Sequence, residues 1–287
     1  MNNAQRAEVL VQALPYIQKY AGKIVVLKFG GSAMVSPELC SAVMRDVALL
    51  QQVGVRVVLV HGGGADISEL LRRLNKEPKF VDGLRVTDQE TMDVAQMVLC
   101  GRINKNLVAQ VQQAGARGVG LCGIDGNLIE TQPCRPELGF VGEVKRVNAK
   151  IVLDMLDLGY IPVVSSVGSG ANGERYNINA DTFAAALATG LGAEALVALT
   201  DTPGILRDRE DASSLIRRIS IDDAPKLIEE GVISGGMIPK VECCREAIRR
   251  GVKRVFIIDG RVMHSILIEL LTDEGMGTMF HTTQTAR

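Results

Sequence analysis

Short apolar runs alternate with amphipathic segments along most of the chain. The runs are rich in Val, Ile and Leu and end at glycine or polar residues, which is typical of buried strands. They lie at residues 24–27, 55–60, 119–122, 161–165, 195–199 and 254–258. Helical patterns separate them, and this alternation predicts an α/β fold with a mainly parallel central sheet covered by helices on both faces.

Sequence signals mark where several of the intervening helices begin and end. Ser36 and Pro37 form a helix start, because serine is a favoured N-cap and proline fits the first turn, and Gly54 ends that helix. Further helices are expected at residues 65–75, 150–159, 182–191, 220–230, 241–250 and 264–271. The turn-rich residues 124–147 predict a hairpin, and residues 277–280 predict a closing edge strand.

The longest helical pattern runs from Asp88 to Ala114 and carries one apolar stripe. The stripe consists of Ala95, Leu99, Ile103, Leu107 and Val111, which recur at four-residue steps. Such a stripe is buried either over the helix's own sheet or against a symmetry mate, where it would form the basic dimer face. The sequence leaves both alternatives open.

The first 22 residues form a separate amphipathic segment ahead of the first strand. Ala7, Leu10, Val11, Leu14 and Ile17 fall on one helical face. Proline inside a helix removes a hydrogen bond, so Pro15 is expected to kink this helix or to begin a second one. The apolar face folds back on its own subunit or meets another. We therefore divide the chain into an oligomerisation helix, residues 1–22, and one larger domain, residues 23–287.

Two of the predicted strands end in glycine-rich turns. Lys28 lies near the end of the first strand and is followed by Gly30 and Gly31, and the second strand ends in His61 followed by three glycines. Glycine lets a ligand approach the main chain closely, and backbone N–H groups near a cation bind phosphate oxygens. These turns have neither the P-loop nor the dinucleotide-binding spacing. Since neighbouring parallel strands end at the same edge of a sheet, both turns are expected to face one ligand site.

Composition limits the classes of function. Hydrophobic residues make up 47% of the chain, which suffices for a large core, and a net charge of −1 without any basic block gives no indication of nucleic-acid binding. No apolar run is long enough to cross a bilayer, so no membrane partner is expected. The six cysteines include no C-x-x-C pair, and no signal peptide is visible. A cytoplasmic protein with free thiols is the expectation.

Two lysines and one aspartate are suited to phosphoryl transfer. Lys28 and Lys240 each adjoin a glycine-rich stretch, and Asp181 lies between them in sequence. Phosphoryl transfer needs positive charge on the moving group and in-line positioning, which a lysine from each half supplies while a carboxylate orients both. Asp181 could also cap the helix that follows it, a role that is compatible with orienting the lysines.

Other polar residues have a structural and a functional interpretation side by side. Arg85 is a surface ion pair or a bidentate ligand for a carboxylate, and Asn177 is a turn residue or a substrate contact. His61 could act as a base by its chemistry, but a structural hydrogen bond is favoured at a strand end. No cluster of His, Cys or carboxylates has the spacing of a metal site, so any Mg²⁺ is expected on nucleotide phosphates.

Six motifs in order give the sequence a resemblance to a known family. They are 28–32 (KFGGS), 60–64 (VHGGG), 82–87 (DGLRVT), 177–181 (NINAD), 200–205 (TDTPGI) and 235–240 (GGMIPK). From about residue 23 to residue 280 the chain resembles the amino acid kinase family, and within it the members that phosphorylate N-acetyl-L-glutamate. The resemblance implies a three-layer αβα sandwich. It also implies ATP-dependent phosphorylation of the side-chain carboxylate of N-acetyl-L-glutamate to N-acetyl-L-glutamyl 5-phosphate, in arginine biosynthesis.

The resemblance also implies roles for individual residues. Lys28 and Lys240 would stabilise the transferring phosphoryl group, and Asp181 would orient them. The residues implied to contact the acetylated substrate are Gly63, Gly64, Arg85 and Asn177, and those implied to contact ATP with its Mg²⁺ are Gly30, Gly31, Asp201, Thr202, Gly204, Ile205, Leu206, Ser234 and Gly235. The substrate would bind to residues 23–175 and ATP to residues 176–287. A carboxylate is already ionised at neutral pH, so no general base is needed.

The amino-terminal helix makes the chain similar to the arginine-inhibited type of this family. These members join dimers into a hexameric ring through such helices, and L-arginine would bind near the carboxyl-terminal region, with Glu269, Gly275 and residues 273–278 as candidates. Phe256 stands where many arginine-sensitive relatives have His. Some relatives bind a PII signal protein, and the sequence leaves this partner open.

Two other kinds of function were weighed against this one. Within the same family, kinases of aspartate, glutamate, carbamate or nucleoside monophosphates are rivals. From another class, the chain would be a non-catalytic sensor of arginine or acetylglutamate. The presence of both lysines and Asp181 favours an enzyme.

Overall fold

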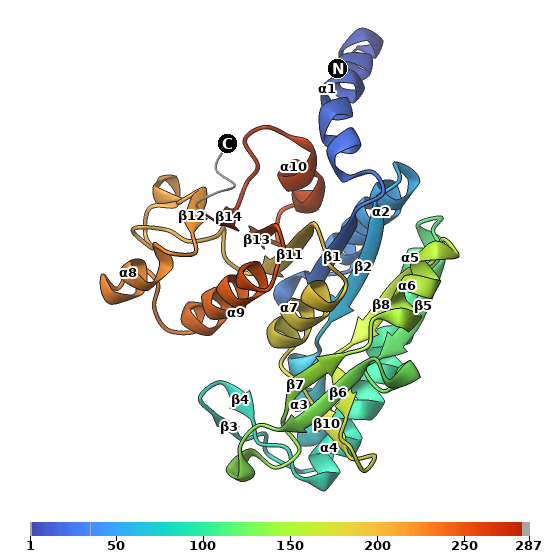
Figure 1. The fold of residues 1–287 in the computed structure, drawn as a ribbon, viewed down its shortest axis with the longest axis vertical. Helices are drawn as coiled ribbons and strands as arrows, with labels where there is room; N and C mark the ends of the chain where they lie inside the picture. Colours follow the sequence, from blue (N-terminus) through green and yellow to red (C-terminus); the bar gives the residue numbers. More distant parts are fainter. Residues whose placement is uncertain (1, 35, 283–287) are drawn as a thin grey trace.

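The computed structural model describes residues 2–34 and 36–282, and its centre is one eight-stranded sheet (Figure 1). The strands lie in the order β12, β14, β13, β11, β1, β2, β8, β5. Their bounds are β1 Ile24–Phe29, β2 Arg56–His61, β5 Gly118–Cys122, β8 Ile161–Ser165, β11 Ala195–Thr200, β12 Arg218–Ser220, β13 Arg254–Asp259 and β14 Thr278–His281. Within the described ranges, neighbouring strands run parallel except for the antiparallel pair β13–β14. The predicted mainly parallel sheet is confirmed.

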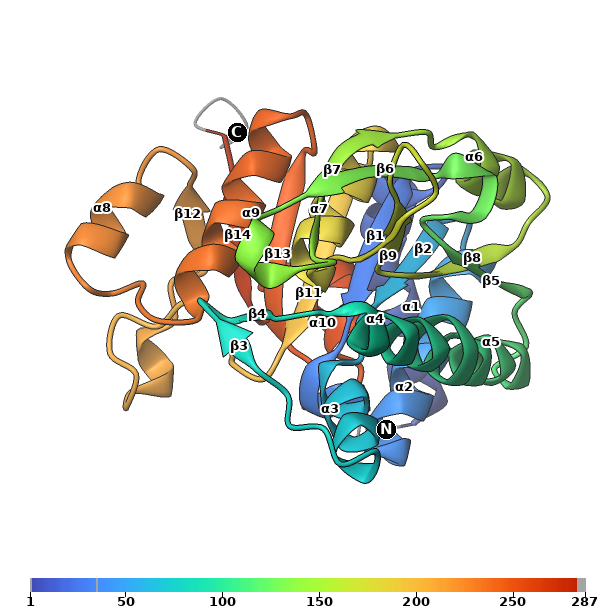
Figure 2. The same cartoon turned by 90° about the horizontal axis from the view of Figure 1, so that it is seen from below.

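Helices cover both faces of this sheet, because alternate strand residues point to opposite sides. Val25, Leu27 and Phe29 of β1 belong to one apolar core, which they share with α2 (Pro37–Gln52). Ile24 and Val26 belong to a second core, shared with α7 (Ala180–Gly190) and α9 (Met237–Arg249). Figure 2 shows α2 and α7 on opposite sides of the sheet. The arrangement is the predicted αβα sandwich.

The remaining elements complete the layers and cover one end of the sheet. The other regular helices are α1 Asn3–Tyr20, α3 Gly64–Arg73, α4 Gln89–Gln96, α5 Asn104–Gln113, α6 Lys150–Asp157, α8 Ala224–Glu229 and α10 Ser265–Leu271, with 3₁₀ turns at Gly31–Met34, Asp125–Asn127, Pro136–Leu138 and Ala212–Ser214. A second sheet contains β10 Arg175–Asn177, β9 Val167–Ser169, β6 Ile129–Pro133 and β7 Gly142–Val147, and β3 Phe80–Val81 pairs with β4 Leu84–Arg85. The predicted hairpin is confirmed as β6–β7. Figure 1 places these small sheets near the carboxyl ends of β1 and β2.

The long helical pattern after Asp88 is one helix with an irregular centre. A π-helical segment, η2 (Met97–Ile103), joins α4 to α5. All five residues of the predicted apolar stripe are buried, at most 6% exposed, in the core beneath the sheet. The stripe therefore packs on its own subunit. The π-segment was not predicted, because single-turn insertions of this kind leave no clear trace in hydrophobic periodicity.

The amino-terminal helix α1 projects from the end of the molecule (Figure 1). Asn2 caps it through a reciprocal hydrogen-bond pair with Gln5, and the helix continues through Pro15 to Tyr20, so no second helix begins at the proline. Leu10 is 72% exposed, and Val9, Val11 and Leu14 are exposed as well, whereas Tyr20 is buried at the base. The apolar face does not fold back on its own subunit.

Several predicted boundaries were wrong. Residues 220–230 were expected to be one helix, but strand β12 runs to Ser220 and α8 begins at Ala224. The strand predicted to close the sheet, β14, lies between β13 and β12, so β12 is the edge. Helix α9 begins at Met237 rather than after Lys240. Among the described residues, no helix is long and apolar enough to cross a membrane.

Candidate active site

The two glycine turns lie side by side at one edge of the sheet, as predicted. Strands β1 and β2 are parallel neighbours, and Phe29 is paired with His61 in their register. The first turn leads into Gly31–Met34 and the second leads directly into α3. Both turns line one pocket, which we call the Arg85 pocket. A ligand there meets main chain from both turns.

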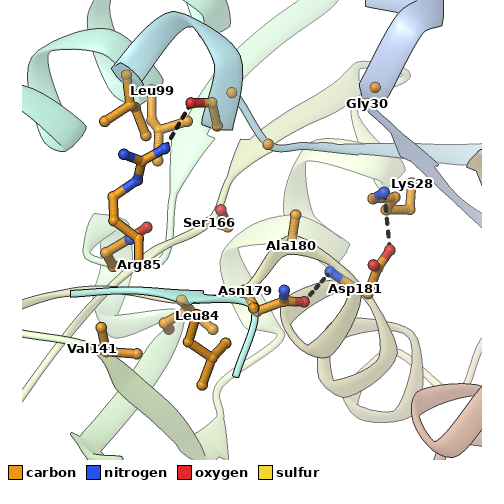
Figure 3. A pocket seen from close by; sticks show the side chains of 18 of the residues that line it. Lys28, Gly30, Leu84, Arg85, Leu99, Val141, Ser166, Asn179, Ala180 and Asp181 are labelled. Carbon is orange, nitrogen blue, oxygen red and sulfur yellow. Dashed lines mark hydrogen bonds and ion pairs between the residues drawn. The ribbon is translucent and has the colours of Figure 1, made fainter. Parts of the chain in front are cut away.

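Lys28, Asp181 and Lys240 form one ion-pair cluster. The Asp181 Oδ1 atom lies 2.9 Å from the Lys28 Nζ atom, and its Oδ2 atom accepts a hydrogen bond of 2.7 Å from Lys240 Nζ. Burial opposes ionisation of Asp181, but the two lysines outweigh it and hold the pKa of the carboxyl below its usual range. Figure 3 shows the contact between Lys28 and Asp181. Two cations share one half-buried carboxylate, which leaves a net positive charge.

Local helix signals place this cluster. Asn179 caps α7, because its side-chain oxygen accepts hydrogen bonds from the backbone N–H groups of Asp181 and Thr182. The alternative interpretation of Asp181 as the cap is therefore wrong, and its carboxylate is free to bind both lysines. Lys240 lies in the first turn of α9, which packs against α7.

Arg85 lies on the opposite side of the Arg85 pocket from Lys28 (Figure 3). Its Nη2 atom donates hydrogen bonds of 2.7 Å to the Gly64 carbonyl and 2.8 Å to Ser68 Oγ. Its Nη1 atom is buried and has no hydrogen-bond partner among the described residues. A buried cationic donor without a partner is costly, so a ligand acceptor is expected there. The guanidinium geometry fits a carboxylate.

Asn177 lies in the same pocket, near Arg85. It belongs to β10, and its side-chain amide is 3.5 Å from Thr87 Oγ1, which in turn donates to the Arg85 carbonyl. The pocket is lined by Lys28, Gly30, Gly31, Gly62, Gly63, Gly64, Ile67, Phe80, Gly83, Leu84, Arg85, Leu99, Val141, Ser166, Asn177, Ile178, Asn179, Ala180 and Asp181. All four residues predicted to contact the acetylated substrate are among them.

A second pocket, the Lys240 pocket, lies on the other side of the ion-pair cluster. It is lined by Asp201, Thr202, Pro203, Gly204, Ile205, Leu206, Arg209, Val232, Ser234, Gly236, Met237, Lys240 and Arg261. Of the residues predicted to contact ATP, six lie here, Gly30 and Gly31 line the Arg85 pocket instead, and Gly235 lines neither pocket. The cluster stands between two pockets, as a transfer reaction between two bound molecules requires.

Comparison with known proteins decides the family. Residues 23–259 match the model of the Amino acid kinase family. The chain belongs to the amino acid kinase family. The resemblance of the six sequence motifs to this family is thus confirmed.

Relatives within the amino acid kinase family match nearly the full chain. The chain is 52% identical to acetylglutamate kinase of Brachyspira hyodysenteriae, with 98% of each chain covered. It is also 52% identical to acetylglutamate kinase of Clostridium beijerinckii, covering 98% of this chain and 100% of the relative.

Among solved structures, the chain is similar in fold to N-acetylglutamate synthase from Neisseria gonorrhoeae complexed with coenzyme A and N-acetyl-glutamate. It has a TM-score of 0.85 and 27% identity, and covers 96% of this chain, which spans 63% of the synthase. The same synthase complexed with coenzyme A and L-arginine has a TM-score of 0.81 and 26% identity, with 96% of this chain and 65% of the synthase covered.

A third pocket of this amino acid kinase brings α1 and the carboxyl-terminal region together. Its lining includes Tyr16, Lys19, Tyr20, Arg217, Arg218, Phe256, Glu269, Leu270, Thr272, Asp273, Glu274, Gly275, Gly277 and Met279, and we call it the Glu269 pocket. Tyr16 of α1 donates a hydrogen bond to Asp273. Glu269 Oε2 accepts from the N–H groups of Met276 and Gly277 at 2.7 and 2.9 Å. Both predicted effector residues therefore lie in a pocket closed by α1.

His61 is buried, at 0% exposure, in the sheet behind the second glycine turn. Burial lowers its pKa to about 4, and its ring contacts the Gly62 carbonyl and Asn104 rather than the open pocket. The structural interpretation favoured from the sequence is confirmed. The six cysteines are free thiols, as predicted.

Two arginines of the Lys240 pocket were missed by sequence reasoning. Arg209 donates to Ser234, and Arg261 forms a two-bond ion pair with Asp259 at the end of β13. Arg209 lies in the charged stretch 207–211, which gives no signal of a ligand. Arg261 follows the apolar run 254–258 and Gly260, a strand-end signal that could have pointed to it. Both add positive charge to this pocket.

Proposed function

We propose that the protein transfers the γ-phosphoryl group of ATP to the side-chain carboxylate of N-acetyl-L-glutamate, a step of arginine biosynthesis. The observation that carries this proposal is the Lys28–Asp181–Lys240 cluster between two pockets, one of which holds the unpartnered Arg85 donor. The names of the relatives, which match over nearly the full chain, support the same substrate.

The acceptor binds in the Arg85 pocket under this proposal. Arg85 Nη1 donates to its α-carboxylate, and Asn177 hydrogen-bonds its amide. The side-chain carboxylate then points toward the glycine turns and Lys28. Because a carboxylate is ionised at neutral pH, it attacks without a general base.

The γ-phosphoryl group enters from the Lys240 pocket. Lys28 and Lys240 approach its oxygens from the two sides, and Asp181 holds both ammonium groups in place. Backbone N–H groups of Gly30, Gly31, Gly63 and Gly64 add donors for oxygen charge that develops during transfer. Charge stabilisation and alignment are the main requirements of this reaction.

The residues present fit an Mg²⁺ ion carried by the nucleotide. Both Asp181 oxygens are engaged by lysines, and the described residues contain no group of three or more His, Cys, Asp or Glu side chains placed to hold an ion. When ATP is bound, Mg²⁺ on its phosphates supplies further charge neutralisation. The division of labour that we propose is acceptor binding mainly by residues 23–175, joined by Asn177, and ATP binding by residues 176–287.

We extend the proposal to regulation at the Glu269 pocket. Glu269, Asp273 and Glu274 supply carboxylates that suit a guanidinium group, and α1 forms one wall. L-Arginine bound there would link α1, and any partner subunit seated on it, to α10. The exposed apolar face of α1 supports a helix-linked hexamer built as a trimer of dimers.

The first test is ADP release with ATP, Mg²⁺ and a panel of acceptors. N-Acetyl-L-glutamate is expected to be preferred over glutamate, aspartate and carbamate, since Asn177 can hydrogen-bond the acetylated amine. Preference for unblocked glutamate would overturn the substrate assignment. Adding L-arginine to the same assay is expected to reduce the rate.

A binding test of the effector site avoids activity as a readout. L-Arginine is expected to raise the Tm of the wild type by a few degrees at about 100 times its Kd, because it binds the folded state. Glu269→Gln is expected to lose most of this shift, and Glu229→Gln on α8 serves as the control. An equal shift in Glu269→Gln would place the effector elsewhere.

A further inference from the structure

A buried polar network lies directly behind the second glycine turn, outside the groups used so far. It joins His61, at the end of β2, to Asn104, the first residue of α5, and both side chains are at most 1% exposed. The Asn104 Nδ2 atom is 3.2 Å from the His61 Nε2 atom. Buried polar side chains are costly unless they are paired, so each atom of this network can be assigned a donor or acceptor role.

The orientation of the Asn104 amide is fixed by its other neighbours. Its Nδ2 atom lies 2.8 Å from the Val163 carbonyl and 3.2 Å from the Leu121 carbonyl, both of which accept. Its Oδ1 atom accepts a hydrogen bond of 3.0 Å from Lys105 Nζ. A flipped amide would place oxygen against two carbonyl oxygens and an amino group against an ammonium. The atom that faces His61 is therefore the Nδ2 amino group, whose two hydrogens are shared among the two carbonyls and the ring nitrogen.

The tautomer of His61 follows from this orientation. Because Asn104 Nδ2 donates, His61 Nε2 has to accept, and the ring proton resides on Nδ1. Nδ1 lies 3.0 Å from the Gly62 carbonyl oxygen, an acceptor. Burial keeps the ring neutral by lowering its pKa to about 4. Asn104, His61 and the Gly62 carbonyl thus form one directed hydrogen-bond chain.

This chain ends on the peptide that carries the Gly63 N–H. A trans peptide is planar, with its C=O and N–H groups on opposite sides. With the Gly62 carbonyl turned toward the His61 ring, the N–H of Gly63 is turned the other way, and Gly63 lines the Arg85 pocket.

Apolar packing from η2 fixes the same glycine. A Cβ atom at Gly63 would lie 2.3 Å from Ile103 Cδ1 and 2.8 Å from Leu99 Cδ2, so η2 presses directly on the turn. Asn104 immediately follows η2, and irregular helical turns of this kind recur at functional sites. Polar and apolar contacts from one irregular helix therefore meet at one peptide.

We propose that Asn104 and His61 are positioning residues, which hold the Gly62–Gly63 peptide so that the Gly63 N–H faces the reacting oxygens in the Arg85 pocket. The inference rests on the proposed kinase function and adds two residues to that site. Neither residue touches the substrate. His61 acts as a fixed neutral donor and takes no proton from the acceptor.

The charged surroundings of His61 are simple. Phe29 and Ser165 are its neighbours in the register of β1 and β8, and neither is charged. Lys105 on α5 is the charged side chain that shifts the His61 pKa, and it lowers it. A carboxylate introduced at position 104 would therefore act on the ring directly, in the opposite direction.

The wild type gives the first test through the nitrogen signals of its histidines. The chain has three histidines, so magic-angle-spinning NMR of the full-length protein labelled with [¹⁵N]histidine resolves protonated from unprotonated ring nitrogens. A neutral His61 with its proton on Nδ1 is expected near neutral pH. A proton on Nε2 would overturn the assignment, whatever the substrate of the enzyme is.

The second test is Asn104→Asp, with Asn106→Asp as the matched control on the exposed side of the same helix. The carboxylate removes the donor and stabilises a charged ring, so kcat is expected to fall about tenfold to hundredfold while KM for ATP changes less than about twofold. A new inflection in kcat near neutral pH is expected, which wild type and Asn106→Asp lack.

If the carboxylate introduced by Asn104→Asp prevents folding, Asn104→Ala tests the same positioning role. It removes the donor without adding charge, so kcat is expected to fall with no new inflection. A folded Asn104→Ala or Asn104→Asp protein with wild-type kcat would overturn the positioning role. Loss of N-acetyl-L-glutamate activity in the wild type would instead refute the proposed function and leave the tautomer result standing.

Discussion

Asp181 is the residue on which the charge balance of the site depends. Each of its oxygens binds one lysine, from β1 and from α9, and the group is half-buried. One negative and two positive charges leave the site positive. This charge favours binding of a phosphoryl group and opposes its release before transfer. Capping of α7 by Asn179 is what frees this carboxylate.

Removing either lysine tests the charge mechanism. Lys28→Ala and Lys240→Ala are each expected to lower kcat by about 10²–10³-fold, because each supplies a donor aimed at transition-state charge. Asp181 keeps one lysine in either variant, so the fold is expected to survive, as circular dichroism would show. Lys226→Ala, an exposed lysine of α8, is the control. Near-normal kcat in both variants would remove the mechanism.

Arg85→Lys tests recognition of the acceptor's α-carboxylate. Lysine cannot reproduce the planar fork that reaches Gly64, Ser68 and the pocket at once. Loss of a charged hydrogen bond of about 1.5–3 kcal/mol predicts a KM for the acceptor raised roughly 10- to 100-fold, with KM for ATP unchanged. Steady-state kinetics of Arg146→Lys, on the surface of β7, provide the comparison.

The buried neutral His61 predicts a stability that falls in mild acid. Its pKa is about 4 in the folded chain against 6.5 for an exposed histidine, so the unfolded chain binds the proton more readily. The free energy of unfolding should therefore decrease as pH falls through 6.5 and level off below 4. Between about pH 7 and about pH 5 the loss is about 2 kcal/mol.

Urea unfolding of wild type and His61→Gln at both pH values measures this term. The variant lacks the titrating ring. The difference in free energy of unfolding between the two proteins should therefore shrink by about 2 kcal/mol from about pH 7 to about pH 5. A difference that is constant with pH would show that His61 is not buried as a neutral base.

At the scale of elements, α1 differs most from its surroundings. Its middle turns carry exposed Leu10, Val11 and Leu14, whereas its last residues join the Glu269 pocket. An exposed apolar helix face of this kind is typical of an interface. The sequence predicted the amphipathic helix but left its partner open, because periodicity shows which face is apolar and not what covers it.

Substitutions on α1 test this interface without touching the rest of the fold. Leu10→Glu combined with Leu14→Glu is expected to break assemblies built through α1 and to leave smaller oligomers, as sedimentation velocity would show, because charge is costly in an apolar contact. Gln18→Glu adds one charge to an exposed position of the same helix as the control. Sedimentation unchanged in the double variant would rule out a helix-linked assembly.

At the scale of the whole molecule, the sequence predicted the sheet and most of the site. Apolar runs located β1, β2, β8, β11 and β13, and glycine turns located the edge where Lys28 and Arg85 line one pocket. The predictions that failed concern features set by long-range contacts. Strand β12 has three residues and is placed by its pairing with β14. The π-helical segment η2 is an irregularity that packing imposes. Arg209 enters the site through a tertiary contact, which local pattern does not record, whereas Arg261 follows the end of β13 and Gly260, a signal that local pattern does contain.

Because Asp181 binds both lysines, the ion-pair cluster can form only late in the synthesis of the chain. Lys28 and Asp181 are present once α7 has been made, but Lys240 follows Asp181 by 59 positions. A nascent chain that has reached only α7 contains the residues that line the Arg85 pocket, yet it holds half of the cationic pair and lacks α9. The cluster is therefore completed only when α9 packs against α7. Incomplete polypeptides released before that point would consume no ATP.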